Sequence, residues 1–179
     1  GDLRWMSIDE YLALKLFSGT QVSYSVASWT GLLDRHRLDW DEGLLAVLPV
    51  TREQLSPLVD ADQPRRGLRG AFARRWPALK NVPWFPAIGD GAAANLGSGC
   101  TSPEKIAITM GSTTAIRAVL PGNVAQIPPG LWCYRVDRAS SLLGGAMSEG
   151  GNVYAWLKQT LRLGDALSEA DLLSGLPAD

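Results

Sequence analysis

The chain has 179 residues, of which 46% are hydrophobic and 20% are charged, a composition typical of a folded globular protein rather than a disordered one. Its 17 Lys and Arg residues nearly balance its 18 Asp and Glu residues, and the net charge of -1 argues against a nucleic-acid partner. The sequence has no signal-peptide pattern and no run of 18 apolar residues, so we expect a soluble, cytoplasmic protein without a membrane span.

Helix-capping patterns mark the N-terminal third of the chain. Ser7 and Glu10 form a capping box, which predicts a helix that ends at Gly19. A second helix is predicted over residues 39–49, from Asp39 to the helix-breaking proline, and a helical turn over residues 51–55. These short elements indicate a region of mixed helices and loops.

Residues 60–83, here called the basic segment, differ from the rest of the chain in charge and in their proline and glycine content. Six basic residues occur there without an acid after residue 63, and prolines and glycines interrupt them. Two interpretations stay open: an anion-binding patch, or a solvated linker between two structural units. The second is favoured because the overall charge is balanced and no aromatic ladder accompanies the arginines.

The second half of the chain has the alternating pattern of an α/β protein. Short apolar runs predict strands at residues 84–88, 105–110, 115–120, 131–136 and 141–143. A small-residue helix is predicted over residues 92–96, and another helix after residues 148–151 that continues through Leu161.

Asp90 lies between two glycines at a predicted strand-to-helix turn. An Asp at this place is commonly an N-cap, but it can also be a general base in a cleft. Gly89, Gly91 and Ala94 also match the G-x-G-x-x-A dinucleotide fingerprint. That match lacks the acidic residue expected about 20 positions later, and Asp90 within it would repel phosphate.

The turn of Gly111, Ser112, Thr113 and Thr114 joins two apolar strands. Its hydroxyl and backbone N–H groups suit a phosphate cradle, although an ordinary hairpin turn explains the pattern equally well. Residues 148–152 form a second glycine-rich helix start. Metal binding is not expected from Cys100, Cys133 and the single histidine, because they are too few and too widely spaced.

Taken together, these motifs resemble the FGGY family of carbohydrate kinases. Residues 23–34 (SYSVASWTGLLD) are similar to the family's block D-x-S-x-A-S-x-T-G-L-(L/F)-D, and residues 88–97 (IGDGAAANLG) to its block G-x-x-D-x-x-A-x-x-x-G. Residues 108–113 resemble the G-T-S segment, with Ser112 and Thr113 in exchanged order, and residues 144–157 resemble a later block that ends in W-L. Residues 131–134 (LWCY) and 148–152 (SEGGN) are most similar to the gluconokinase branch of the family.

The resemblance implies an actin-like ATPase (ribonuclease H-like) fold of two α/β domains and ATP-dependent phosphorylation of a sugar, with ATP and Mg²⁺ as cofactors. Gluconate, giving 6-phosphogluconate, is the expected substrate. Asp90 matches the catalytic base, with Gly91 beside it at the substrate. The residues that match the nucleotide-binding segments are Gly111, Ser112, Thr113 and Gly151.

Family members have roughly 450–550 residues, as two large domains require. We therefore expect only the middle section here: residues 1–83 from the end of the first domain, and residues 84–179 from the start of the second. Such a section alone should be inactive, because the segments for Mg²⁺, most sugar contacts and adenine are absent. Its partner should be a small molecule, neither nucleic acid nor membrane, and a homodimer is left open.

Three alternatives remain at this point. The chain could belong to a xylulose or glycerol kinase of the same family, or to a non-catalytic regulator derived from a kinase. It could also be a nucleotide-dependent oxidoreductase that uses Gly89, Gly91 and Ala94. A hairpin at Gly111 would favour the kinase, and a parallel strand there would favour the oxidoreductase.

Overall fold

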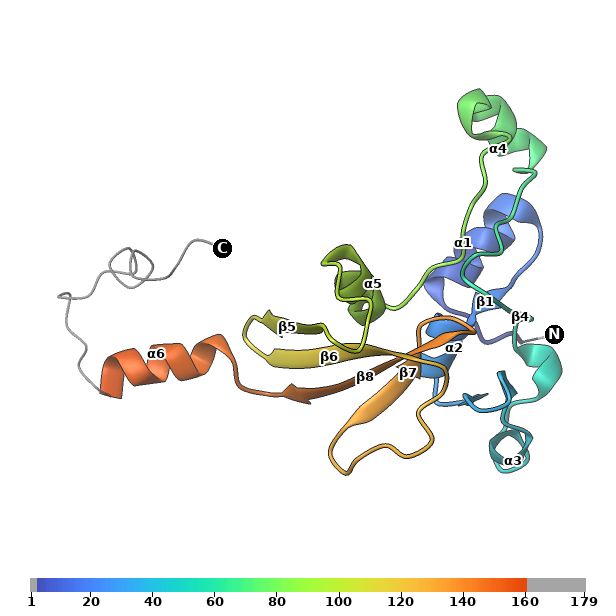
Figure 1. The fold of residues 1–179 in the computed structure, drawn as a ribbon. Coiled ribbons are helices and arrows are strands. Elements are labelled where there is room, and N and C mark those ends of the chain that lie inside the picture. The colour runs from blue at the N-terminus through green and yellow to red at the C-terminus, as the bar shows by residue number, and fades with distance from the viewer. Residues whose placement is uncertain (1–2, 161–179) are drawn as a thin grey trace. The chain divides into compact units, whose positions relative to one another are not determined.

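A computed structural model describes residues 3–160 of the chain (Figure 1). The described residues fall into two compact units. The first contains residues 3–107 and 117–144, and the second contains residues 108–116 and 145–160. Each unit is built from its own helices and strand segments.

Helix α1 (Ile8–Phe17) begins with the predicted capping box. The Ser7 N–H donates to Glu10 Oε2 at 2.6 Å, and the Glu10 N–H donates to Ser7 Oγ at 3.3 Å. The predicted Gly19 cap is wrong by one residue. Ser18 takes the left-handed conformation, with φ of 72°, and its N–H donates to the Leu14 carbonyl.

The short elements after α1 form the core of the first unit. Strand β1 (Val22–Ser23) pairs in parallel with β4 (Leu58–Val59), and helix α2 (Tyr24–Trp29) follows β1 directly. Strands β2 (Leu33–Asp34) and β3 (Asp39–Trp40) form an antiparallel pair. Their buried side chains make one cluster that contains Val22, Ala27, Trp40, Leu45 and Leu55.

The helix predicted over residues 39–49 is much shorter in the structure. Asp39 is in β3, and Asp41 caps helix α3 (Glu42–Leu45) by accepting the Leu44 N–H at 3.0 Å. The later cap takes over because the pairing of β3 with β2 holds Asp39 in an extended conformation. The helical turn predicted over residues 51–55 is confirmed as the 3-10 helix η1 (Arg52–Gln54).

The basic segment contains helix α4 (Gly70–Arg75) and the 3-10 helix η2 (Pro77–Leu79). Arg65 forms an isolated antiparallel bridge with Trp84, and its guanidinium donates to the carbonyls of Gly19 and Gln21 at 2.9 Å each. Burial lowers the pKa of Arg65. Arg65 therefore links parts of the first unit. The strand predicted over residues 84–88 is wrong, since only Trp84 pairs there.

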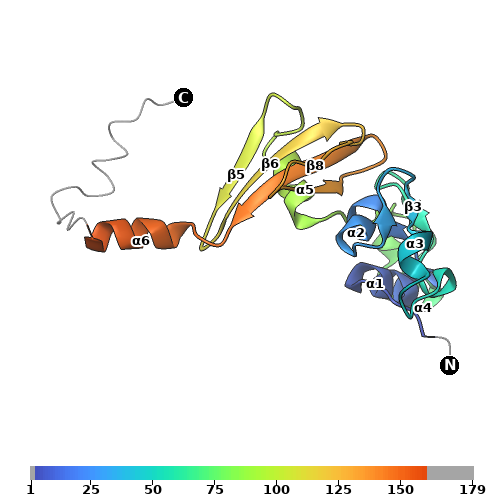
Figure 2. The ribbon, with the colours of Figure 1, turned by 90° about the horizontal axis from the view of Figure 1, so that it is seen from below.

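Four strands follow helix α5 (Asp90–Gly97) in the chain and are hydrogen-bonded in the order β5-β6-β8-β7. Figure 2 labels the first three of these, β5, β6 and β8, in that order. They are β5 (Ile106–Met110), β6 (Thr114–Pro121), β7 (Trp132–Arg135) and β8 (Ser140–Met147). Helix α5 packs on this sheet through a cluster of Ala92, Val119, Val136 and Leu142. The predicted strands at residues 105–110, 115–120, 131–136 and 141–143 are thus confirmed within a few residues.

Helix α6 (Gly151–Thr160) is the last element described. It begins where residues 148–151 predict a helix start, and the predicted continuation through Leu161 lies outside the described residues. None of the helices in residues 3–160 has the length and apolar character needed to cross a bilayer.

Candidate functional site

Asp90 is the first residue of α5 and is exposed to solvent. Gly89 occupies the N-cap position, so the N-cap interpretation of Asp90 is wrong. The Gly91 N–H donates to Asp90 Oδ1 at 2.6 Å. The first turn of a helix presents N–H groups that have no partner within the helix, and the Asp90 carboxylate accepts one of them. The fold thus displays a carboxylate at a helix start.

Gly91 is buried beneath Asp90, where α5 meets the sheet. A Cβ added at Gly91 would lie 3.0 Å from Arg117 Nε and 3.5 Å from Leu142 Cδ2. Glycine at this position therefore lets α5 approach β6 closely, because a Cβ would be tight against the Arg117 side chain and in ordinary contact with Leu142. A contact between Gly91 and substrate stays a prediction.

Helix α2 holds the backbone that leads into Asp90. Ser23 Oγ donates to the Ala87 carbonyl at 2.6 Å, and the Gly89 N–H donates to Ser25 Oγ at 3.0 Å. A Cβ added at Gly89 would lie only 2.6 Å from Trp29 Nε1. Sequence reasoning placed residues 23–34 in a family block without this role. Only the tertiary structure places α2 against residues 87–89.

The turn of residues 111–113 connects β5 and β6 in the second unit. Because β5 and β6 are neighbours joined by three residues, they form an antiparallel hairpin. The Gly111 N–H donates to the Thr113 carbonyl at 2.8 Å, and all three residues are exposed. The predicted hairpin at Gly111 is confirmed, with Ser112 and Thr113 at its tip.

The start of α6 contacts this turn. The Gly151 N–H donates to the Gly111 carbonyl at 2.7 Å, so two residues predicted from separate motifs meet. Gly150, which sequence reasoning did not select, is buried. A Cβ on Gly150 would lie 2.6 Å from the Gly111 carbonyl oxygen and 2.8 Å from Thr114 Oγ1. The doubled glycine at residues 150–151 is the signal that could have identified it.

The dinucleotide fingerprint at Gly89, Gly91 and Ala94 has no support in the fold. The strand that should precede it is absent from residues 85–88, and a hairpin replaces the parallel strand that should follow. The oxidoreductase hypothesis is therefore wrong, because a Rossmann unit needs a strand, a helix and a parallel strand in succession.

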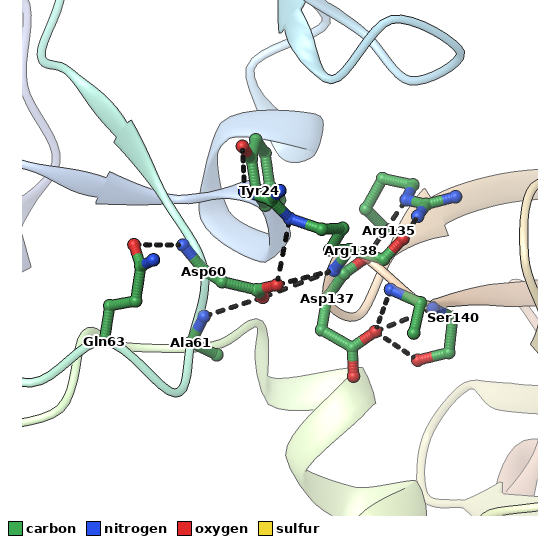
Figure 3. Close-up of polar contacts among 9 residues, drawn as sticks. Tyr24, Asp60, Ala61, Gln63, Arg135, Asp137, Arg138 and Ser140 are labelled. Atoms are coloured by element: carbon green, nitrogen blue, oxygen red, sulfur yellow. Dashed lines mark hydrogen bonds and ion pairs between the residues drawn. The ribbon is translucent and has the colours of Figure 1, made fainter.

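An ionic contact joins the β7–β8 turn to β4 and α2 (Figure 3). Asp60 accepts the Arg138 N–H at 3.2 Å and forms an ion pair with Arg138 Nε at 3.6 Å, while Arg138 Nη2 donates to the Tyr24 hydroxyl at 3.3 Å. Asp137 Oδ1 accepts the N–H groups of Ala139 and Ser140 at 2.7 Å each, which shapes the turn. The same first unit that presents Asp90 is thus tied together around α2.

Arg135, at the end of β7, is only 2% exposed, and burial lowers its pKa. Its guanidinium donates to the carbonyls of Asp137 and Gly122 at 3.1 and 3.0 Å. Cys100 and Cys133 are free thiols, and burial raises the pKa of Cys133. No group of three or more His, Cys, Asp and Glu side chains that could hold a metal occurs within residues 3–160.

Comparison with known proteins gives consistent matches. Residues 3–97, more than half of the chain, match the family model described as "FGGY family of carbohydrate kinases, N-terminal domain". A gluconokinase of Bacillus subtilis (strain 168) is 28% identical over 155 residues, which cover 87% of this chain and 30% of that protein. A glycerol kinase of Stenotrophomonas maltophilia (strain K279a) is 30% identical over 190 residues, covering 100% of this chain and 36% of that protein.

Solved structures agree with these sequence matches. A ligand-bound xylulose kinase and a gluconate kinase, both from Lactobacillus acidophilus, each superpose with a TM-score of 0.79 at 25% identity. Each match covers 96% of this chain, and 34% and 35% of the two solved chains respectively. The chain spans about a third of the length of the curated relatives it matches.

Proposed function

The chain belongs to the FGGY family of carbohydrate kinases, and from this membership we propose that a protein carrying it transfers the γ-phosphate of ATP to a hydroxyl group of a sugar or sugar acid. The observation that carries the proposal is the exposed Asp90 carboxylate at the start of α5, within the segment matched by the family model. A carboxylate so displayed can approach a substrate hydroxyl, since it is exposed to solvent.

Asp90 acts as the general base. Its carboxylate accepts the proton of the attacking hydroxyl as the oxygen reaches the γ-phosphorus. The hydrogen bond from the Gly91 N–H to Oδ1 orients the carboxylate. Positioning and charge stabilisation supply most of the rate enhancement in phosphoryl transfer, so the orientation of this group matters as much as its basicity.

The turn of Gly111, Ser112 and Thr113 holds the phosphates of ATP, with Gly151 behind it. Support comes from the exposure of the two hydroxyl residues and from the close approach of Gly150 and Gly151 to Gly111, a place that any Cβ would fill. ATP supplies the phosphoryl group, and Mg²⁺ is its expected companion. Residues 3–160 offer no group of metal-ligating side chains, so no step is assigned to a metal ligand there.

Gluconate is the proposed substrate, and 6-phosphogluconate the product. Two gluconokinases, from Bacillus subtilis and Bacillus licheniformis, match at 28% and 29% identity. A glycerol or xylulose substrate is the second candidate, favoured by the 30% identity to a glycerol kinase over 190 residues and by the xylulose kinase structure. An ADP-release assay of the full-length gene product on gluconate, xylulose and glycerol separates them. Activity on glycerol or xylulose without gluconate would overturn the first choice.

A domain boundary near residues 83–84, a cytoplasmic location and a homodimer stay proposals. The family model of the N-terminal domain matches through residue 97, so its match extends past that boundary. Limited proteolysis of the full-length protein would locate the linker, because cleavage concentrates in exposed segments with few tertiary contacts.

The substitution Asp90→Asn in the full-length enzyme tests the base assignment. It keeps the shape of the side chain but removes the proton acceptor, so we expect kcat to fall by about 10²- to 10⁴-fold. Asp62→Asn is the matched control, an acid-to-amide change in the basic segment away from the proposed site. Normal turnover of Asp90→Asn would contradict the assignment.

A further inference from the structure

The backbone before Asp90 is held by two buried hydroxyl groups, one from Ser23 at the N-cap of α2 and one from Ser25 in its first turn. Ser23 and Ser25 are each 1% exposed, so water does not compete for their hydroxyls. Ser23 Oγ donates to the Ala87 carbonyl, and Ser25 Oγ accepts the Gly89 N–H, across 64 residues of sequence in both cases. The two contacts flank Ile88 and leave little freedom to the peptide units that lead into Asp90.

The Trp29 indole lies next to the same backbone, at Gly89. Its indole lies so near Gly89 that a Cβ there would be 2.6 Å from Nε1 and 2.9 Å from Cε2. The indole also stacks on Tyr134 of β7, with ring centroids 5.2 Å apart and an interplanar angle of 25°. Tyr134 thus supports one face of the indole beside Gly89, while the Trp29 side chain as a whole is 49% exposed.

The position of Asp90 depends directly on this arrangement. Gly89 is the N-cap of α5, and Asp90 is the next residue, so any displacement of Gly89 moves the Asp90 Cα. A displacement of about 1 Å between reacting groups can reduce a rate by about 10²-fold. A proton acceptor at a helix start needs such a support because the first turn lacks the backbone hydrogen bonds that stabilise the helix interior.

We propose that Ser25 and Trp29 are positioning residues for Asp90, acting through the Gly89 backbone rather than on the substrate. This inference rests on the proposed function, in which Asp90 is the base. It adds that the block at residues 23–34 serves catalysis by fixing the residues just before α5. The contacts of Ser25 with Gly89 and of Trp29 with Gly89 and Tyr134 all lie within the first unit.

The control for a purely structural role is Ser28, on the same helix. Its hydroxyl donates to the Ser25 carbonyl at 2.9 Å and accepts the Arg135 N–H at 3.1 Å. Ser28→Ala therefore removes one hydroxyl that accepts a backbone N–H, as Ser25→Ala does. The N–H that it leaves unpaired belongs to β7, not to residues 87–89. Loss of α2 stability affects both variants, whereas loss of Asp90 positioning affects only Ser25→Ala.

The test compares Ser25→Ala and Ser28→Ala in the full-length enzyme. For Ser25→Ala we expect kcat to fall about 10- to 100-fold. The KM for ATP should stay within about twofold, because the change removes no contact of the proposed phosphate turn. For Ser28→Ala we expect both constants within about threefold of the parent. Amide hydrogen exchange of Gly89 should accelerate in Ser25→Ala and stay unchanged in Ser28→Ala, which is a readout independent of turnover.

The outcomes separate the two levels of the proposal. Equal losses of kcat in both serine variants, or unchanged exchange of Gly89 in Ser25→Ala, would overturn the positioning role. Normal kcat in Ser25→Ala together with an inactive Asp90→Asn would overturn it while leaving Asp90 as the base. Full activity of Asp90→Asn would overturn Asp90 as the general base, on which the positioning role rests, and the exchange of Gly89 would then report only on structure.

Discussion

The two turns that carry the candidate residues are held in opposite ways. Side chains hold the turn before Asp90, through the hydroxyls of Ser23 and Ser25 and the indole of Trp29. The turn at residues 111–113 is held by a backbone contact instead. Gly150 and Gly151 have no side chains, so the backbone at the start of α6 can approach the Gly111 carbonyl. Removing a side chain should therefore disturb the turn before Asp90, whereas adding one at residue 150 or 151 should disturb the turn at residues 111–113.

The largest effect on stability should come from Gly150→Ala. Its Cβ would meet a backbone carbonyl oxygen at 2.6 Å, and backbone cannot move aside as a flexible side chain can. We expect a loss of about 2–3 kcal/mol in the free energy of unfolding, measured by urea denaturation of the full-length protein. Gly97→Ala is the control, since nothing lies within 4 Å of its added Cβ. If Gly150→Ala leaves the free energy of unfolding unchanged, the turn at residues 111–113 does not require glycine at residue 150, and the proposed difference between the two turns is wrong.

Gly89→Ala should cost less, about 1–2 kcal/mol, because its obstacle is a side chain. The φ of Gly89 is -60°, which alanine adopts without strain, so the penalty comes from Trp29 alone. The variant Trp29→Leu should then relieve most of it, and a double-mutant cycle measures the coupling. Additive effects of the two substitutions would show that the indole does not restrict Gly89.

Asp60→Asn should have a smaller effect, about 0.5–1 kcal/mol. The ion pair with Arg138 at 3.6 Å is partly open to solvent, since the Arg138 side chain is 63% exposed, and such pairs contribute little. The loss should shrink at high salt because screening already weakens the pair in the parent protein. Unfolding measured at low and high salt tests this, and a salt-independent loss would indicate that the hydrogen bonds to Asp60 dominate instead.

Acid should have the smallest effect on the two turns, because hydroxyl, indole and amide groups make most of their contacts. The Ala87 N–H, which donates to Asp9 Oδ2 at 3.3 Å, is an exception. A titrating contact occurs elsewhere: backbone N–H groups of Arg37 and His36 lower the pKa of Asp34 below 3.8. The stability from this depressed pKa is present above about pH 4 and is lost as pH falls through the folded-state value. The free energy of unfolding should fall less between pH 5 and pH 3 in Asp34→Asn than in the parent protein. An equal fall in both proteins would show that other carboxylates cause the acid sensitivity.

Sequence reasoning succeeded where a structure depends on near neighbours. The capping boxes at Ser7 and Thr51 and the hairpin at Gly111 each involve residues three or four positions apart. It failed where distant residues decide. Asp39 entered β3 through pairing with Asp34, and the expected strand at residues 84–88 found no partner beyond the bridge at Trp84.

The local sequence pattern also did not predict which side chains of α1 are buried. In α1 the apolar Ile8 is 74% exposed, whereas Glu10 is buried at 5%, where its carboxylate accepts the Ser7 N–H. The capping box correctly predicted a helix, but it does not indicate which face of that helix packs in the first unit. Which face is buried depends on the elements that pack against the helix, and the sequence of the helix alone does not specify them.

The sequence by itself determined the family, the α/β character of the second half, the capped helix starts and the presence of Asp90 between two glycines. These follow from residue types and short spacings that constrain the backbone locally. Only the tertiary structure decided that Gly89 and not Asp90 caps α5, that Ser25 and Trp29 hold Gly89, and that Gly150 must lack a side chain. Those facts depend on contacts between segments far apart in the chain, which form only when packing brings the segments together.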